Sequence, residues 1–141
     1  MTIPNPEASQ QEEETPLYRI SLDRLDELNR SVITLLAARR SPMSPSMMKE
    51  DHELDSPQEL LDEIADYCGD VEEFINSSMP IQEIIFRTML ARRNEPISLT
   101  DLHRELTERW ATPVRPIHIS QRNLARILDS DDYYGFARAG E

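Results

Sequence analysis

Residues 96–140 constrain the fold most, because two amphipathic helix patterns and a β-favouring run follow one another there. Ser98 and Ser120 stand at the two helix starts, where a serine side chain can accept hydrogen bonds from free backbone N–H groups. Residues 133–138 (YYGFAR) favour a strand, which we expect to pair with a short strand at Ile97. The order predicts a mainly α unit with a small β component. Its apolar residues recur at helical spacing: Leu99, Leu102, Leu106 and Trp110, then Leu124, Ile127 and Leu128.

Charge divides this 141-residue chain into an acidic first part and a neutral second part. The net charge is −12. Residues 42–79 hold Lys49 against eleven acidic residues, whereas residues 80–141 hold equal numbers of arginines and acidic residues. Indiscriminate nucleic-acid binding needs clustered positive charge, so this distribution argues against it. The acidic part instead favours a protein partner with a basic surface.

The first half of the chain divides into three segments by composition. Residues 1–16 contain four glutamates and no apolar run, which predicts a disordered acidic tail. Residues 17–41 predict an amphipathic helix that begins after Ser21 and ends near Arg40, before two prolines. Residues 42–55 mix Pro, Ser, Met and charged residues without an apolar period, which is typical of a linker. The three methionines of this linker either dock in a groove or belong to a solvated connection.

The predicted helix within residues 17–41 carries an apolar stripe that must be covered. Leu25, Leu28, Val32 and Leu35 follow 3-4-3 spacing on one side of it. Two interpretations stay open. The stripe docks a partner or a second copy of the chain, which would give a homodimer, or it packs on the chain's own core.

Residues 56–79 predict an acidic helical segment that packs on the next helix. Ser56, Pro57 and Glu59 give the residue order of a helix start, and the only cysteine, Cys68, shares the apolar face, so we expect it in the core. The helix predicted over residues 80–93 is apolar on two sides and should therefore be covered on two sides. The opposite, polar face of the acidic segment is a candidate partner surface: Glu59, Asp62, Glu63 and Asp66.

The polar face of the last predicted helix is a second candidate surface. Its residues are Gln121, Arg122, Asn123 and Arg126. Arginine, asparagine and glutamine can hydrogen-bond base edges, and the two arginines could also meet phosphates. Three aspartates follow directly, however, and would repel a phosphate backbone: Asp129, Asp131 and Asp132. This face could therefore bind either DNA or a protein.

A family resemblance covers about 60 residues, from Ile85 through LARRNEPISLTDLHRELTERW to ISQRNLARILDSDDYYGFARAGE. This run resembles the winged helix-turn-helix modules of the RNA polymerase delta subunit and related HARE-type domains. The resemblance implies a winged-helix domain over residues 80–141 and a role in transcription, with RNA polymerase as a partner. Here the acidic part precedes the domain, the connection between its last two helices is longer, and the wing is shorter.

No catalytic pattern accompanies these elements. The chain has three glycines, no G-x-S-x-G or H-E-x-x-H motif, and no His residues paired with one another or placed near Cys68. We therefore expect a protein that is not an enzyme and that has no cofactor and no bound metal. No apolar run is long enough to span a bilayer and the N-terminus has no secretory signal, which indicates a cytoplasmic protein.

Three functions agree with these features. The first is a transcription-associated regulator or accessory factor that binds a protein partner through its acidic surface. The second is a protein-only adaptor or assembly factor, in which the winged helix is a scaffold and the helix over residues 22–40 docks a partner. The third is a sequence-specific DNA-binding repressor that uses Arg122 and Arg126, which the charge balance disfavours.

Overall fold

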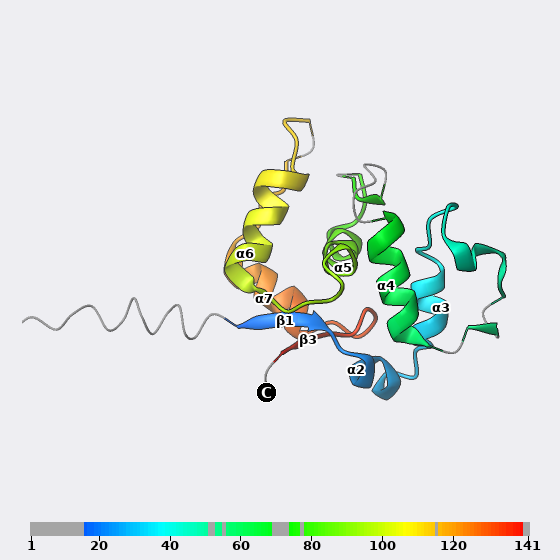
Figure 1. Cartoon of the computed structure of the whole chain (residues 1–141). Helices are drawn as coiled ribbons and strands as arrows, with labels where there is room; N and C mark the ends of the chain where they lie inside the picture. Colours follow the sequence, from blue (N-terminus) through cyan, green and yellow to red (C-terminus); the bar gives the residue numbers. More distant parts are fainter. Residues whose placement is uncertain are drawn as a thin grey trace, which may run out of the picture.

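A three-stranded antiparallel sheet joins segments from the two ends of the described chain (Figure 1). The computed structural model describes residues 16–50, 53–54, 56–68, 74–76, 78–114 and 116–139. The strands are β1 (Leu17–Ile20), β2 (Ile97–Ser98) and β3 (Phe136–Arg138), and β1 lies between the other two. Residues of β1 alternate between exposed and buried, so one face of this strand points into the core.

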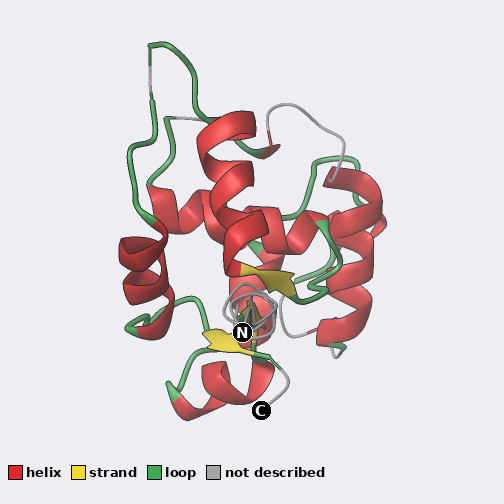
Figure 2. Ribbon diagram, turned by 90° about the vertical axis from the view of Figure 1, so that its left-hand side faces the viewer, coloured by secondary structure: helices red, strands yellow, loops and turns green. Residues whose placement is uncertain are grey.

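Helices make up most of the rest of the structure (Figure 2). The structure is thus mainly helical with a small antiparallel sheet, which confirms this coarser part of the predicted fold class. The helices are α2 (Leu22–Glu27), α3 (Val32–Ala37), the 3-10 helix η1 (Pro45–Met48), α4 (Pro57–Cys68), α5 (Ile81–Ala91), α6 (Leu99–Arg104), its π-helical continuation η4 (Glu105–Trp110) and α7 (Gln121–Asp129).

Helix α5 lies at the centre of the core. Ile84, Ile85, Phe86, Met89 and Leu90 are at most 1% exposed, although they point to more than one side of the helix. Helix α4 packs along α5, and β1 also contacts α5. In Figure 1, α5 lies between α4 and the pair α6 and α7. The expectation that this helix is covered on two sides is confirmed.

The prediction of one continuous helix over residues 17–41 is wrong. Residues 17–20 form β1, and the helical part is broken into α2 and α3. Helix α2 does begin after Ser21, whose hydroxyl accepts a hydrogen bond from the Arg24 N–H at 3.1 Å. Asn29 then takes a left-handed backbone conformation (φ 59°), which ends the helix. Ser31 caps the second helix by accepting from the Thr34 N–H at 3.2 Å.

The predicted pairing of the last strand with Ile97 is also wrong. Both β2 and β3 pair with β1, so that Tyr18 stands opposite Ile97 on one side and Arg138 on the other. Residues 80–141 therefore do not complete a sheet alone, and the predicted domain boundary at residue 80 divides one sheet between two segments. The N-terminal segment supplies the central strand.

Parts of four predicted segments fall outside the described residues. These are residues 1–15 of the acidic tail, residues 51–52 and 55 of the linker, residues 69–73 and 77 of the acidic helical segment, and residues 115 and 140–141 of the last segment, together with the side chain of Cys68. Within the predicted linker, residues 45–48 form η1. Among the described residues, no helix is long and apolar enough to cross a membrane.

Candidate functional site

The four residues predicted on the last helix lie together on an exposed surface of α7. Leu124 and Leu128 face the core at 0% exposure, which turns the opposite face of the helix outward. Ser120 fixes the start of this helix by accepting a hydrogen bond from the Asn123 N–H at 3.1 Å. We call this the α7 surface, and its exposed residues are Gln121, Arg122, Asn123 and Arg126.

The two arginines of the α7 surface differ from those of the neighbouring elements. Arg104, Arg109 and Arg138 each form an ion pair with a carboxylate, with closest distances of 3.0, 3.6 and 2.9 Å. Arg122 and Arg126 form no ion pair with any other residue that the structure describes. Their guanidinium groups therefore remain free for contacts outside the described chain.

Two of the aspartates that follow the α7 surface have internal partners. Asp129 accepts from the Tyr18 hydroxyl at 2.9 Å and pairs with Arg138, whose hydrogen bond lowers the pKa of this carboxyl. Burial and the hydrogen bond to Asp129 raise the pKa of Tyr18 to about 12. Asp131 accepts from the Gly135 N–H at 2.8 Å and holds the turn before β3. The expected repulsion of phosphate by these aspartates is therefore smaller than their number suggests.

The four carboxylates predicted on α4 are partly committed to the fold. Arg93, just after α5, pairs with Asp62 at 3.4 Å and with Asp66. Glu63 accepts from the backbone N–H of Ser46 at 3.2 Å and from its hydroxyl. Of the four, only the exposed Glu59 has a carboxylate without a polar contact to another described residue. The α4 acidic surface (Glu59, Asp62, Glu63 and Asp66) is therefore partly structural.

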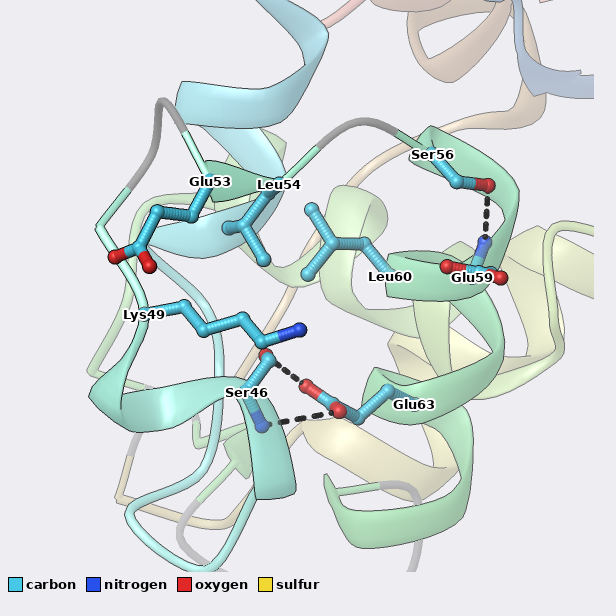
Figure 3. A pocket seen from close by; sticks show the side chains of 8 residues that line it. All are labelled: Ser46, Lys49, Glu53, Leu54, Ser56, Glu59, Leu60 and Glu63. Atoms are coloured by element: carbon cyan, nitrogen blue, oxygen red, sulfur yellow. Dashed lines mark hydrogen bonds between the residues drawn. The ribbon is translucent and has the colours of Figure 1, made fainter.

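A groove lies between α4 and the segment that contains η1 (Figure 3). Leu54 and Leu60 give it an apolar part, and carboxylates of Glu53, Glu59 and Glu63 stand around it. Its volume is about 110 Å³, which fits one or two side chains of a partner. We call it the Ser46 groove, and its lining residues are Ser46, Lys49, Glu53, Leu54, Ser56, Glu59, Leu60 and Glu63.

The apolar stripe predicted as a docking or dimerisation element lies largely inside the chain's own core. Leu25 is 0% exposed and Leu35 is 6% exposed, while Leu28 and Val32 are half-buried. Helix α3 packs on α4 and on α2. Two of the four stripe residues are therefore covered within this chain, and the stripe does not form a free apolar face for a second copy.

A partly buried ion-pair network was not predicted from the sequence. The Glu83 carboxylate of α5 accepts from Arg39 Nη2 at 2.8 Å, from Arg87 Nε at 2.7 Å and from the Tyr134 hydroxyl at 2.9 Å. The side chains of Arg39 and Glu83 are 11% and 13% exposed. The Glu83 network (Arg39, Glu83, Arg87 and Tyr134) ties α3 and the turn before β3 to the central helix.

The hydrogen bonds of this network reverse the effect of burial on its acid. Burial raises the pKa of the Glu83 carboxyl, but hydrogen bonds from Arg39 and Arg87, with the Arg39 charge, outweigh burial and hold that pKa at about 2. For Tyr134, burial and the hydrogen bond to Glu83 raise the pKa to about 12. Glu83 is therefore ionised and Tyr134 neutral at pH 7.

Comparison with known proteins leaves the geometry as the guide to function. Searches of protein-family models, curated proteins and solved structures found no match. Across the described residues, no group of three or more His, Cys, Asp or Glu side chains is placed to hold a metal ion. Among the described residues, the candidate surfaces are the α7 surface, the α4 acidic surface and the Ser46 groove.

Proposed function

We propose that this protein is a non-enzymatic accessory factor in transcription that binds a protein partner with a basic surface through its acidic half. The observation that carries the proposal is the separation of charge in space. Among the described residues, helix α4 and the segment around η1 carry six acidic residues against Lys49: Glu50, Glu53, Glu59, Asp62, Glu63 and Asp66. They lie on one side of α5, whereas α6 and α7 lie on the other (Figure 1). Such a field attracts and orients a basic partner.

The arrangement of the second half supports a winged-helix-like scaffold for this role. Helix α5, strand β2, helices α6 and α7, and strand β3 follow one another in the order of a winged helix-turn-helix module. Strands β2 and β3 belong to one antiparallel sheet, with β1 between them. The link to RNA polymerase comes from the resemblance of residues 85–141 to the delta subunit and HARE-type modules.

Reversing exposed acidic charges tests the proposed function. We expect the tagged protein to recover RNA polymerase subunits from native lysate after nuclease treatment. The double substitution Glu50→Lys and Glu59→Lys should reduce that recovery about tenfold, because positive charges then face the basic partner. Both side chains are exposed, so the fold should tolerate the change. Quantitative mass spectrometry measures the recovery.

A charge-matched control separates this surface from net charge alone. Glu95→Lys with Asp132→Lys changes the net charge equally at exposed positions in other parts of the fold and should leave recovery unchanged. Equal loss in both variants would contradict the assignment of the partner to the acidic half. Recovery of a complex unrelated to transcription would replace the accessory factor with the protein-only adaptor.

The arginines of the α7 surface, which are exposed and form no ion pair with another described residue, favour a second candidate function, sequence-specific DNA binding. If it operates, selection from random duplexes at low salt should yield a preferred site, and Arg122→Ala with Arg126→Ala should weaken binding to it tenfold or more. A bidentate arginine contributes roughly 1–3 kcal/mol of base discrimination, and lost phosphate contacts also lower the salt dependence. Electrophoretic mobility shifts measure both effects.

The matched control for DNA binding uses arginines that already have internal partners. Arg104→Ala with Arg109→Ala removes the same positive charge from α6 and η4, where both side chains pair with carboxylates. Binding should then fall much less than in the α7 variant. Failure to select any site, or equal loss in both variants, would exclude DNA reading by α7.

A further inference from the structure

The side chains of three methionines near η1 are exposed to solvent and do not belong to the buried core. Met43, Met47 and Met48 are 78%, 44% and 92% exposed, whereas Met89 in α5 is 0% exposed. Leaving large apolar side chains in water forgoes the free energy that their burial would contribute. Three exposed methionines within six residues of the chain make this segment a candidate interaction surface.

The segment that carries these methionines is fastened to two helices. Arg40, just after α3, donates to the backbone carbonyl of Ser46 and, at 3.4 Å, to that of Lys49. From α4, the Glu63 carboxylate accepts from the Ser46 N–H at 3.2 Å. The backbone on both sides of Met47 and Met48 is therefore held against the fold while the side chains point away from it. A prearranged surface loses less conformational entropy on binding.

The methionines adjoin the Ser46 groove. Met47 and Met48 stand between Ser46 and Lys49, and both of these residues line the groove. Figure 3 shows Leu54 and Leu60 side by side in the groove, with the Lys49 ammonium group pointing into it. The Glu63 carboxylate is bound to Ser46, and the Glu53 carboxylate points away from the two leucines. The exposed methionines and the Ser46 groove thus belong to the same segment, with the carboxylates of Glu53 and Glu59 nearby.

We propose that Met43, Met47, Met48 and the Ser46 groove form a docking surface for a basic amphipathic helix of the protein partner. Apolar side chains of such a helix would pack on the methionines, whose unbranched thioethers adapt to varied shapes. Its lysines or arginines would meet Glu53 and Glu59. The carboxylates disfavour an acidic peptide or an anionic membrane surface by like-charge repulsion. This inference rests on the proposed function for the existence of a basic partner, and it adds the partner's form and its place of contact.

Peptide binding to the full chain tests this surface directly. The probe is a fluorescent helical peptide of about 18 residues, or five turns, with leucines at i, i+3, i+4 and i+7 and lysines elsewhere. We expect fluorescence anisotropy to show saturable binding of this peptide. A scrambled peptide of the same composition, which has no apolar face, should bind about tenfold more weakly, because charge alone then attracts it.

Exposed positions allow variants that should leave the fold intact. Met43→Gln with Met48→Gln should weaken binding of the amphipathic peptide about tenfold, and Glu59→Gln should weaken it about threefold. Val114→Gln is the control, since Val114 is 88% exposed in the loop before α7. It should bind the peptide as the unchanged protein does.

Two results would overturn the docking surface. Equal affinity for the amphipathic and scrambled peptides would show that charge alone attracts them, and unchanged affinity in the methionine variant would place the contact elsewhere. Neither result decides the proposed function. That function is tested separately, by the recovery of polymerase subunits and its loss in the Glu50 and Glu59 variant. Failure of the proposed function with retained, methionine-dependent peptide binding would assign the same surface to a partner outside transcription.

Discussion

Glu83→Gln is expected to lower the free energy of unfolding by about 3 kcal/mol, the lower end of the cost of breaking a buried ion pair by removing one partner, because this pair is only partly buried. The substitution keeps the shape of the side chain but removes its charge. Arg39, whose side chain is 11% exposed, would then lose its two charge-assisted hydrogen bonds to the Glu83 carboxylate. Urea unfolding followed by circular dichroism measures the change.

A partly exposed pair supplies the control for this prediction. Glu105 lies 3.6 Å from Arg109 with side chains 29% and 62% exposed, so Glu105→Gln should cost less than about 1 kcal/mol. If Glu83→Gln costs no more than this control, the network does not stabilise the fold. Tyr134→Phe removes one hydrogen bond to Glu83 without changing the charge and should fall between the two.

The same carboxyl gives stability a pH dependence in the acid range. The pKa of Glu83 is about 2 in the folded protein and 4.5 without the fold, so the unfolded chain binds the proton more readily. Its contribution is therefore complete above about pH 5 and is lost as the pH falls toward 2. The decrease in unfolding free energy over this range should be smaller in Glu83→Gln. Parallel pH profiles for the two proteins would contradict the depressed pKa.

Gly135→Ala is expected to lower the free energy of unfolding by about 3 kcal/mol or more, from two separate causes. Gly135 has φ +83°, a conformation that residues with a side chain adopt only with strain. A β-carbon at this position would also lie 2.5 Å from Leu25 Cγ, and Leu25 is 0% exposed and enclosed by the core. Thermal and urea unfolding measure the loss.

A double-mutant cycle separates the steric cause from the backbone strain. Leu25→Ala removes the atoms that the new methyl group would meet, so the two substitutions together should cost less than the sum of their separate effects. Asp132→Ala, at an exposed position in the same turn, should change stability by less than about 0.5 kcal/mol. Stability of Gly135→Ala close to that of the unchanged protein would show that the turn can relax.

Local features of the fold could be predicted from the sequence because their causes are local. Ser21, Ser98 and Ser120 were predicted as helix caps, and each accepts a hydrogen bond from the N–H three residues on. Strand β1 was missed because its four residues gain their stability from partners far away in the chain. The alternation of LYRI, with Tyr18 and Ile20 buried, was the available signal.

The candidate surfaces divide in the same way. The exposure of Arg122 and Arg126 follows from the amphipathic pattern of a single helix. The Glu83 network needs three elements to meet, so the sequence offered only the Glu83 and Arg87 pair at i, i+4 spacing within an apolar helix. The Ser46 groove depends on how Arg40 and Glu63 hold the segment between them, which no residue pattern within residues 42–55 encodes.

The central place of β1 determines when the protein can fold during its synthesis. A ribosome makes β1 before any of its partners, and the Tyr18 hydroxyl bonds to a carboxylate 111 residues further along. Closing so long a loop lowers the conformational entropy of the chain before the contacts of the sheet can offset that loss. Individual helices can form as they emerge, but the strand at the centre stays unpaired until β2 and then β3 have been translated. The nascent chain therefore completes its native sheet only late in its synthesis.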